Sequence, residues 1–104
     1  MRALLIALCL AAGPALAADP AADLAVGKAL FLKGATPACA VCHTLKDAGS
    51  AGEVGPVLDE LKPSADRVAA ALRNGVGMMP SYKGQLTDAQ IMAIARYVAA
   101  VTAR

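Results

Sequence analysis

Histidine and aromatic side chains are scarce in this sequence, which has one His, one Phe, two Tyr and no Trp among its 104 residues. A domain of this size buries a modest share of its surface and often needs a covalent or metal staple. Because large apolar side chains are few, we expect a group that is not an amino acid to fill part of the core. The single His also excludes any site that needs two imidazoles from this chain.

The sequence also lacks a strong excess of charge. Its formal net charge is +2, which excludes nucleic-acid binding as the main function, because that function requires a strongly basic face. At the N-terminus, Arg2 precedes an apolar run that ends in the small-residue pattern at residues 15–17, Ala-Leu-Ala, typical of a secretory signal peptide. The run is shorter than the roughly 20 residues of a membrane-spanning helix. We therefore predict a cleaved signal peptide over residues 1–17, a periplasmic domain over residues 18–104 and no membrane span after cleavage; a retained N-terminal anchor is the alternative.

The rest of the chain has helical patterns and lacks the alternation of strands, so we predict an all-α fold. Pro20 suits the first position of a helix and Gly34 its end. Ser64 is a natural N-cap, and Thr87 forms a capping box with Gln90. The helical segments expected are residues 20–33, a short turn at residues 39–46, residues 64–74 and a C-terminal helix from residue 87.

The only His lies directly after the second of two cysteines, in the motif Cys-Ala-Val-Cys-His at residues 39–43. Cys39 and Cys42 are three residues apart and lie on the same side of a helical turn. Both thiols can add to the two vinyl groups of one haem, and His43 is then directed at the iron. This spacing is the signature of c-type haem attachment, which takes place outside the cytoplasm and so agrees with the predicted export signal. The sequence therefore predicts one haem c, covalently bound through Cys39 and Cys42.

Three other uses of this motif agree less well with the sequence. A zinc site normally takes four protein ligands, whereas Cys39, Cys42 and His43 supply three and no second cluster follows. A thioredoxin-like redox pair occurs in a βαβ context, for which the chain has no pattern. A disulfide between the two cysteines would close a very small loop and contribute little stability.

The iron needs a ligand on the side opposite His43, and Met is the soft ligand that is left. Met/His ligation is typical of cytochromes c, and the candidates are Met78, Met79 and Met92. Met92 lies in the predicted C-terminal helix, where a Met usually serves packing. Met78 and Met79 lie in a glycine-broken loop, followed by Pro80, that can lie flat against a haem face. Hydrophobic gap-filling is the alternative role for this pair, and the residues alone leave both open as ligands.

Four motifs resemble the small class I monohaem cytochromes c of bacteria: Cys-Ala-Val-Cys-His at 39–43, Gly-Pro-Val-Leu at 55–58, Met-Pro at 79–80 and Leu-Thr-Asp-Ala-Gln-Ile-Met-Ala-Ile-Ala-Arg-Tyr-Val at 86–98. The resemblance covers about residues 24–101 and implies the cytochrome c fold, with three to four helices wrapped around one covalently bound haem. It favours Met79, the Met directly before Pro, as the axial ligand. It also implies that the carbonyl oxygen of Pro56 accepts a hydrogen bond from the His43 ring, which agrees with the need of a metal-bound imidazole for such an acceptor.

The resemblance implies further contacts within the fold. Gly27 and Phe31 are expected to cross the last helix near Ile94 and Tyr97. A Trp that contacts a haem propionate in relatives is missing here, and the candidates to replace it are Tyr82, Ser81, Lys83 and Arg73. Contact between Tyr82 and the Met79 sulfur is an alternative. The side chains expected to wrap the porphyrin are Leu30, Leu58, Leu61, Leu72 and Ile94.

The function predicted from these features is one-electron transfer in the periplasm, through a haem iron held between His43 and Met79. The expected partners are redox proteins, with a dehydrogenase as donor and an oxidase or another cytochrome as acceptor, and the chain is a monomer or a subunit of a heteromer. Residues 42–63 resemble cytochromes of sulfite or related sulfur-compound dehydrogenases, so a tightly bound haem subunit of a dehydrogenase is the first alternative. A haem enzyme or gas sensor with an open sixth site is the second, although no further His is present to serve it.

Overall fold

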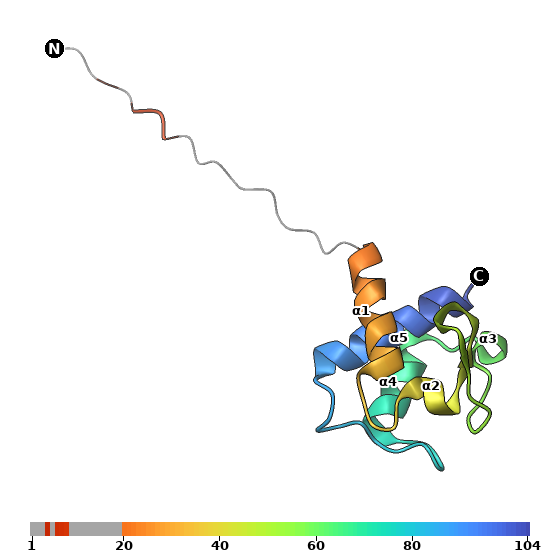
Figure 1. Cartoon of the computed structure of the whole chain (residues 1–104). Helices are drawn as coiled ribbons and strands as arrows, with labels where there is room; N and C mark the ends of the chain where they lie inside the picture. The colour runs from red at the N-terminus through yellow and green to blue at the C-terminus, as the bar shows by residue number, and fades with distance from the viewer. Residues whose placement is uncertain (1–3, 5, 9–19) are drawn as a thin grey trace.

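The computed structural model describes residue 4, residues 6–8 and residues 20–104 (Figure 1). The predicted cleavage site after Ala17 lies outside the described residues. No helix of the described part is long and apolar enough to cross a membrane. Its elements, in chain order, are α1 (Pro20–Lys33), α2 (Cys39–Cys42), β1 (Thr44–Leu45), the 3₁₀ turn η1 (Lys46–Ala48), β2 (Ser50–Ala51), α3 (Leu58–Leu61), α4 (Ala65–Asn74) and α5 (Asp88–Thr102).

Helices α1 and α5 cross in direct contact and form the frame of the fold (Figure 1). A Cβ atom at Gly27 would lie 2.4 Å from the carbonyl oxygen of Ala93 and 2.5 Å from Cβ of Tyr97, so the helices approach this closely only with glycine at this position. One turn further along α1, the Phe31 ring meets the Tyr97 ring edge to face, with 6.1 Å between their centroids. The predicted crossing of the two helices is confirmed, and the α5 residues that lie against Gly27 are Ala93 and Tyr97.

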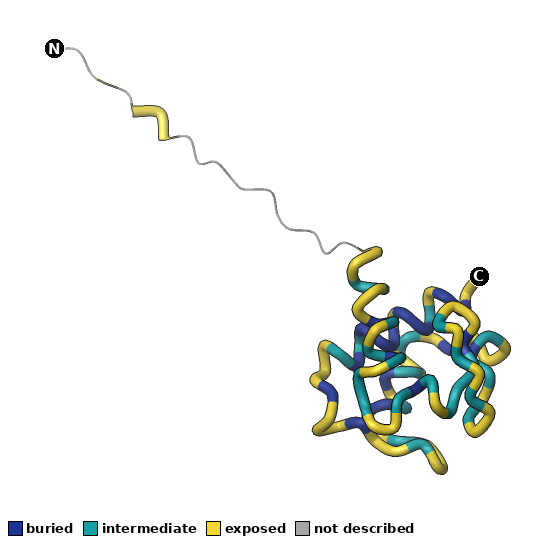
Figure 2. Tube along the Cα trace, viewed as in Figure 1, coloured by how far each residue is buried: buried dark blue, intermediate teal, exposed yellow. Residues whose placement is uncertain are grey.

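Helix α5 carries more buried residues than any other helix of the described part (Figure 2). The Tyr97 hydroxyl donates to Oδ2 of Asp47 at 2.6 Å, and Nζ of Lys28 on α1 lies 3.7 Å from the same oxygen. The hydrogen bond from Tyr97 lowers the pKa of Asp47, with a further contribution from Lys28. Burial, together with this bond, raises the pKa of Tyr97. The network ties α1 and α5 to η1, which follows the Cys-His motif closely.

Most helix limits agree with the sequence prediction. Helix α1 spans the expected residues, the Ser64 hydroxyl accepts a hydrogen bond from the Arg67 amide at the start of α4, and Thr87 and Gln90 form the capping box of α5. The all-α class is confirmed. The described part has five α-helices: four lie at predicted segments, and the fifth, α3, was not predicted. Helices α2 and α3 have four residues each.

The helical turn expected over residues 39–46 ends earlier, at Cys42. His43 is extended, with φ −114° and ψ 136°, and the next two residues pair with Ser50–Ala51 as a small antiparallel hairpin. Ser50 provides the physical reason, because its hydroxyl donates to the carbonyl oxygen of His43 at 2.9 Å and accepts from the amide of Leu45 at 3.1 Å. The carbonyl oxygen of His43 and the amide of Leu45 thus have hydrogen-bond partners in Ser50, which a longer helix would have to provide within itself.

Candidate haem-binding site

A cavity of about 500 Å³, with largely apolar walls, opens between α2, α4, α5 and the loop that follows α4. This volume lies within the range of roughly 300–1,000 Å³ that is usual for ligand pockets. Four of the side chains expected to wrap the porphyrin line the cavity: Leu58, Leu61, Leu72 and Ile94. The expectation for Leu30 is wrong, because Phe31 is the α1 residue that lines the cavity, and the helix turns the neighbouring Leu30 against another part of the core.

Cys39 and Cys42 both line this cavity from α2. They are free thiols here, with Cys39 buried and Cys42 half-buried. Burial raises the pKa of the free Cys39 thiol to about 11, so the sulfur holds its proton at neutral pH. The short helix thus presents two sulfurs to the same cavity, as attachment to two vinyl groups of one porphyrin requires.

His43 lines the same cavity, and a backbone carbonyl sets the orientation of its ring. Its Nδ1 lies 2.8 Å from the carbonyl oxygen of Pro56. Because a carbonyl oxygen can only accept, Nδ1 carries the proton and donates, which leaves the lone pair of Nε2 free for a metal. A Cβ atom at Gly55 would lie 2.5 Å from the ring carbon Cε1. Residues 55–56 therefore provide both the hydrogen-bond acceptor and the space that this imidazole needs.

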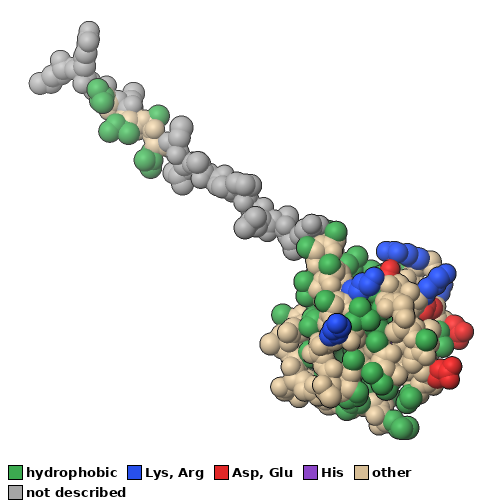
Figure 3. Space-filling model, in the orientation of Figure 1, with side chains coloured by type: hydrophobic (Ala, Val, Ile, Leu, Met, Phe, Trp, Pro, Cys, Tyr) green, Lys and Arg blue, Asp and Glu red, His purple; other side chains and the backbone are tan. Residues whose placement is uncertain are grey.

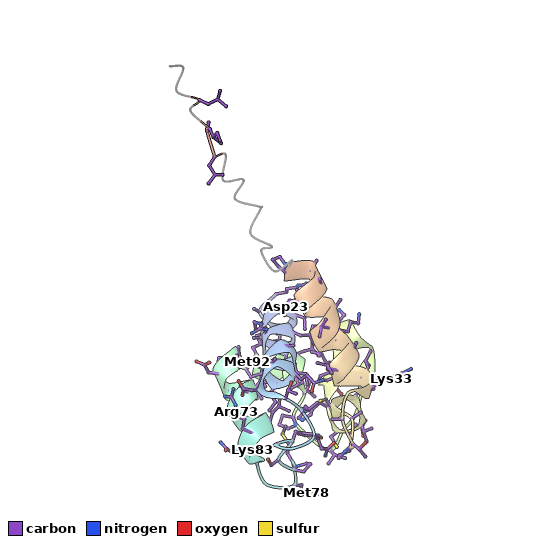
Figure 4. The ribbon with its side chains drawn as sticks, turned by 90° about the vertical axis from the view of Figure 1, so that its left-hand side faces the viewer. Asp23, Lys33, Arg73, Met78, Lys83 and Met92 are labelled. Carbon is purple, nitrogen blue, oxygen red and sulfur yellow. The ribbon has the colours of Figure 1, made fainter. Side chains whose placement is uncertain are left out.

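The two loop methionines differ in their surroundings. Residues 76–79 form a tight turn in which the backbone groups of Val76 and Met79 bond to each other, at 2.8 and 3.0 Å. Met79, at the end of the turn, is half-buried, packs against the core and lines the cavity. Met78 contributes to the cavity lining but is 89% exposed, and it lies at the outer end of the loop (Figure 4). Met92 packs against the core and is not part of the lining.

Tyr82 is buried in the cavity wall, and its hydroxyl donates to the carbonyl oxygen of Pro37 at 2.6 Å. The hydroxyl is therefore not directed at the Met79 sulfur, which was the alternative contact expected for it. Burial raises the pKa of this phenol, so the side chain stays neutral at physiological pH. The bond joins the segment after the methionine loop to the segment just before α2, on two sides of the same cavity.

The sequence predicts the charged residues near the cavity only in part. Arg73 pairs with Asp88 at 2.6 Å, and neither Arg73 nor Lys83 belongs to the lining (Figure 4). Arg67 does line the cavity, although its type and position in the sequence did not single it out. Its spacing could have indicated this position, because Arg67 lies four residues before the cavity residue Ala71 and therefore shares that face of α4.

Comparisons with known sequences and structures match this chain to cytochromes. A family model described as cytochrome c oxidase, cbb3-type, subunit III, matches residues 22–98. Cytochrome c6 of Synechocystis sp. is 35% identical over 86 residues, which cover 75% of this chain and 65% of that protein. Cytochrome c6 of Leptolyngbya boryana is 32% identical over 74% of this chain and 91% of that protein. The crystal structure of the c-type cytochrome SorU from Sinorhizobium meliloti superposes with a TM-score of 0.76 at 52% identity, over 79% of this chain and 93% of that one.

Fold, site and relatives together define a small c-type cytochrome with one haem, a class of electron carriers rather than of enzymes. The chain belongs to the cytochrome c family of the matching model, described as cytochrome c oxidase, cbb3-type, subunit III. Its cofactor is covalently attached haem c, and Cys39 and Cys42 fit the attachment motif. The residues present fit the group chemically, since they combine two thiols three residues apart, an imidazole with a free Nε2 and apolar walls.

Proposed function

We propose that this cytochrome is exported to the periplasm and carries single electrons through a haem iron bound by Nε2 of His43 and the sulfur of Met79. The observation that supports this proposal is the shared cavity, because both donors line it together with the two motif cysteines. Imidazole and thioether are the ligand pair typical of cytochromes c. An iron that is bound on both sides has no open position for a substrate, which is the arrangement of a carrier rather than of an enzyme.

Met79 is favoured over Met78 as the axial ligand because of the position of each side chain in the turn. Met79 is already half-buried and in contact with the core, so binding a metal would order it at little extra entropic cost. Met78 would have to withdraw a side chain that is 89% exposed. The expectation from the Met-Pro motif and the burial of the two side chains therefore agree.

The chain's own groups tune the iron in two ways. The carbonyl oxygen of Pro56 holds the proton on Nδ1 of His43, which fixes the ring and makes Nε2 a better donor. The largely apolar walls would surround the haem with few polar groups, which would disfavour the more highly charged ferric state and raise the reduction potential. The haem supplies a change of iron valence, and ligands that stay bound in both states keep the rearrangement on electron transfer small.

An exposed apolar rim next to the cavity suits contact with a redox partner. Val54, Val76 and Met78 belong to the cavity lining and are each more than half exposed. In Figure 3 the charged side chains of the visible face lie in its middle, upper and right-hand parts, whereas apolar and neutral side chains form the lower edge. Few charges would have to be desolvated for a partner to approach such a rim. We propose a dehydrogenase as the donor and an oxidase or another cytochrome as the acceptor.

A bound haem subunit of a dehydrogenase is the second candidate function. It is favoured by the resemblance of residues 42–63 to cytochromes of sulfite or related sulfur-compound dehydrogenases, and the likeness to the c-type cytochrome SorU is compatible with it. Gel filtration of the protein from its native cells separates the two functions. A free monomer that a donor enzyme reduces in passing supports the shuttle, whereas a stable complex with a catalytic subunit supports the subunit.

The export and the attachment are tested together by the intact mass of the protein from the periplasm. The proposal requires a chain that begins at Ala18 and carries the mass of one haem. A chain that keeps residues 1–17 would support a retained anchor instead. A mature chain without the extra mass would contradict the covalent haem.

The iron ligands are tested by replacing each loop Met separately. In the oxidised protein, a far-red absorption band reports Met sulfur on ferric iron, and we expect Met79→Ala to abolish it. Met78→Ala is the matched control, because it removes the same side chain from the neighbouring position, and it should leave the band intact. Loss of the band in Met78→Ala alone would assign the ligand to Met78. A wild-type spectrum that is high-spin and binds carbon monoxide readily would favour a haem enzyme or gas sensor.

A further inference from the structure

Two side chains of the segment that follows the methionine loop are bonded to the segment that precedes the motif cysteines. The hydroxyl of the buried Tyr82 donates to the carbonyl oxygen of Pro37 at 2.6 Å. The Gln85 side chain bonds twice to Thr36: its Oε1 accepts from the Thr36 amide at 3.0 Å, and its Nε2 donates to the Thr36 carbonyl oxygen at 2.9 Å. Three hydrogen bonds therefore join two segments whose paired residues are 45 and 49 positions apart in the sequence.

The backbone that carries these two side chains is itself held in place. The amides of Gln85 and Leu86 both donate to the carbonyl oxygen of Tyr82 at 3.0 Å, which closes a tight turn. The amide of Tyr82 donates to the carbonyl oxygen of Leu72 at 2.7 Å, so the turn is attached to the last part of α4. Met79 lies three positions before this turn, and the position of the turn therefore limits where the Met79 side chain can reach.

The proposed sixth ligand depends on the distance between the two sides of the cavity. The haem would be attached to the side that carries the cysteine motif, and Pro37 lies two positions before that motif and lines the same cavity. The sulfur of Met79 comes from the other segment. Contacts within one side stabilise that side, whereas a contact between the two sides sets the distance over which the sulfur must reach. The bonds of Tyr82 and Gln85 are contacts between the two sides.

We infer that Tyr82 and Gln85 are positioning residues for the sixth ligand: their bonds to residues 36–37 keep the Met79 sulfur within reach of the iron and oppose its displacement by an external ligand. The inference deepens the proposed function and rests on it, because it concerns the same Met79 in the same cavity. An external ligand binds only in the fraction of molecules in which Met79 has left the iron, so its apparent affinity measures that fraction. Hydrogen bonds that favour the closed arrangement lower the fraction.

The two side chains should contribute unequally, because their surroundings differ. Tyr82 is 3% exposed, so water does not readily replace its hydroxyl as the partner of Pro37. Gln85 and Thr36 are exposed, and water can take over part of their hydrogen bonding when the glutamine is removed. We therefore expect the phenol to provide the larger part of the effect.

The test is a titration of the oxidised, haem-loaded protein with imidazole, followed through the far-red band that reports Met sulfur on ferric iron. Tyr82→Phe removes the hydroxyl and keeps the ring in the cavity wall. Imidazole should bind to this variant about fivefold more tightly than to wild type, as the loss of one buried hydrogen bond implies. Gln85→Ala should show a gain of about twofold. The double variant should bind imidazole more tightly than either single variant.

Matched controls separate positioning from general stability. Tyr97→Phe also removes a hydroxyl that donates at 2.6 Å, but neither Tyr97 nor its partner Asp47 lines the cavity. Gln90→Ala is the control for Gln85→Ala, since Oε1 of Gln90 accepts from the Thr87 amide at 2.9 Å within the cap of α5. Both controls should lower the free energy of unfolding in urea and leave the affinity for imidazole unchanged.

An imidazole affinity in Tyr82→Phe equal to that of wild type, or an equal gain in Tyr97→Phe, would overturn the inference. Should Tyr82→Phe fail to take up haem, Gln85→Ala decides by the same criterion against Gln90→Ala. Loss of the far-red band in Tyr82→Phe before imidazole is added, with the band retained in Tyr97→Phe, would support the inference. A wild type without the band would instead overturn the Met79 ligation of the proposed function, so the two failures are distinguishable.

Discussion

The two sides of the cavity are held in different ways. On the His43 side of the cavity (residues 39–56), two backbone hydrogen bonds hold the motif. The amide of His43 donates to the carbonyl oxygen of Cys39, and the amide of Gly55 donates to the carbonyl oxygen of Cys42 at 2.7 Å. Ser50 and Pro56 add bonds to the backbone and the ring of His43. On the Met79 side, residues 75–82, the ligand candidate is held by the turn bonds to Val76, and its neighbour Met78 is exposed.

This difference indicates that the protein itself positions the imidazole of His43, whereas fewer bonds hold the backbone on the side of Met79. The side with more bonds is also the side with covalent attachment, because Cys39 and Cys42 lie next to His43 in sequence. We therefore expect disturbances of the His43 side to affect the whole fold, and disturbances of the Met79 side to affect chiefly the sixth ligand.

The largest effect is expected for Gly55→Ala on the His43 side. The new Cβ would lie 2.5 Å from Cε1 of His43, and displacing the ring should lower the free energy of unfolding by about 2–3 kcal/mol. Urea unfolding of the haem-loaded protein measures the change. Gly49→Ala is the control for the loss of a glycine, because nothing lies within 4 Å of the new Cβ. Its φ of +64° adds a backbone strain of about 1–2 kcal/mol that Gly55→Ala does not have, so the loss in Gly55→Ala must exceed this value. Equal losses in the two variants would mean that the space beside His43 is not decisive.

An intermediate effect is expected for Ser50→Ala compared with Ser81→Ala. Ser50 bonds to the carbonyl oxygen of His43 and to the amide of Leu45 from a half-buried position, so its loss should cost about 1–2 kcal/mol. Ser81 makes a similar bond to Arg73 on the Met79 side, but it is exposed and water can replace it. Urea unfolding should therefore show the smaller loss for Ser81→Ala. The reverse order would contradict the comparison between the two sides.

The smallest effect is expected for Tyr97→Phe. Tyr97 lies where α1 and α5 cross, outside both the His43 side and the Met79 side of the cavity. Loss of the hydrogen bond to Asp47 should lower the free energy of unfolding by about 1 kcal/mol at neutral pH. This is less than for a fully buried bond to a charged group, because the Asp47 side chain is 31% exposed. The folded-state pKa of Asp47 is lowered, so its contribution is present above the unfolded-state pKa of about 3.9 and is lost as the pH falls through the folded-state pKa.

The difference in stability between wild type and Tyr97→Phe should therefore shrink in urea unfolding below about pH 4. Asp47→Asn, which cannot ionise, should lack this acid-dependent component. The far-red band should be unchanged in both variants, since neither residue lines the cavity. A difference that stays constant with pH would show that the phenol acts only through packing.

Local signals explain which parts of the fold and the site could be predicted. The caps at Ser64 and Thr87 act within their own helices, and the spacing of Cys39 and Cys42 encodes attachment directly, so these features can be read from neighbouring residues. The burial of Met79 and the bond between Tyr82 and Pro37 depend on contacts between segments far apart in the chain. The hairpin after His43 is local, but it depends on the bonds of the Ser50 hydroxyl, whose partners the sequence pattern does not specify. Leu30 illustrates the limit, because a rotation of one residue on α1 decides whether Leu30 or Phe31 faces the cavity.

The central claim, iron held between His43 and Met79, is tested most directly by proton NMR of the reduced, haem-loaded protein with methyl-labelled Met. A methyl group directly over a porphyrin lies in the shielding region of its ring current and is shifted far upfield. We predict one such methyl signal, retained in Met78→Leu and absent in Met79→Leu. An upfield signal that persists in Met79→Leu, or no shifted methyl in wild type, would contradict the claim.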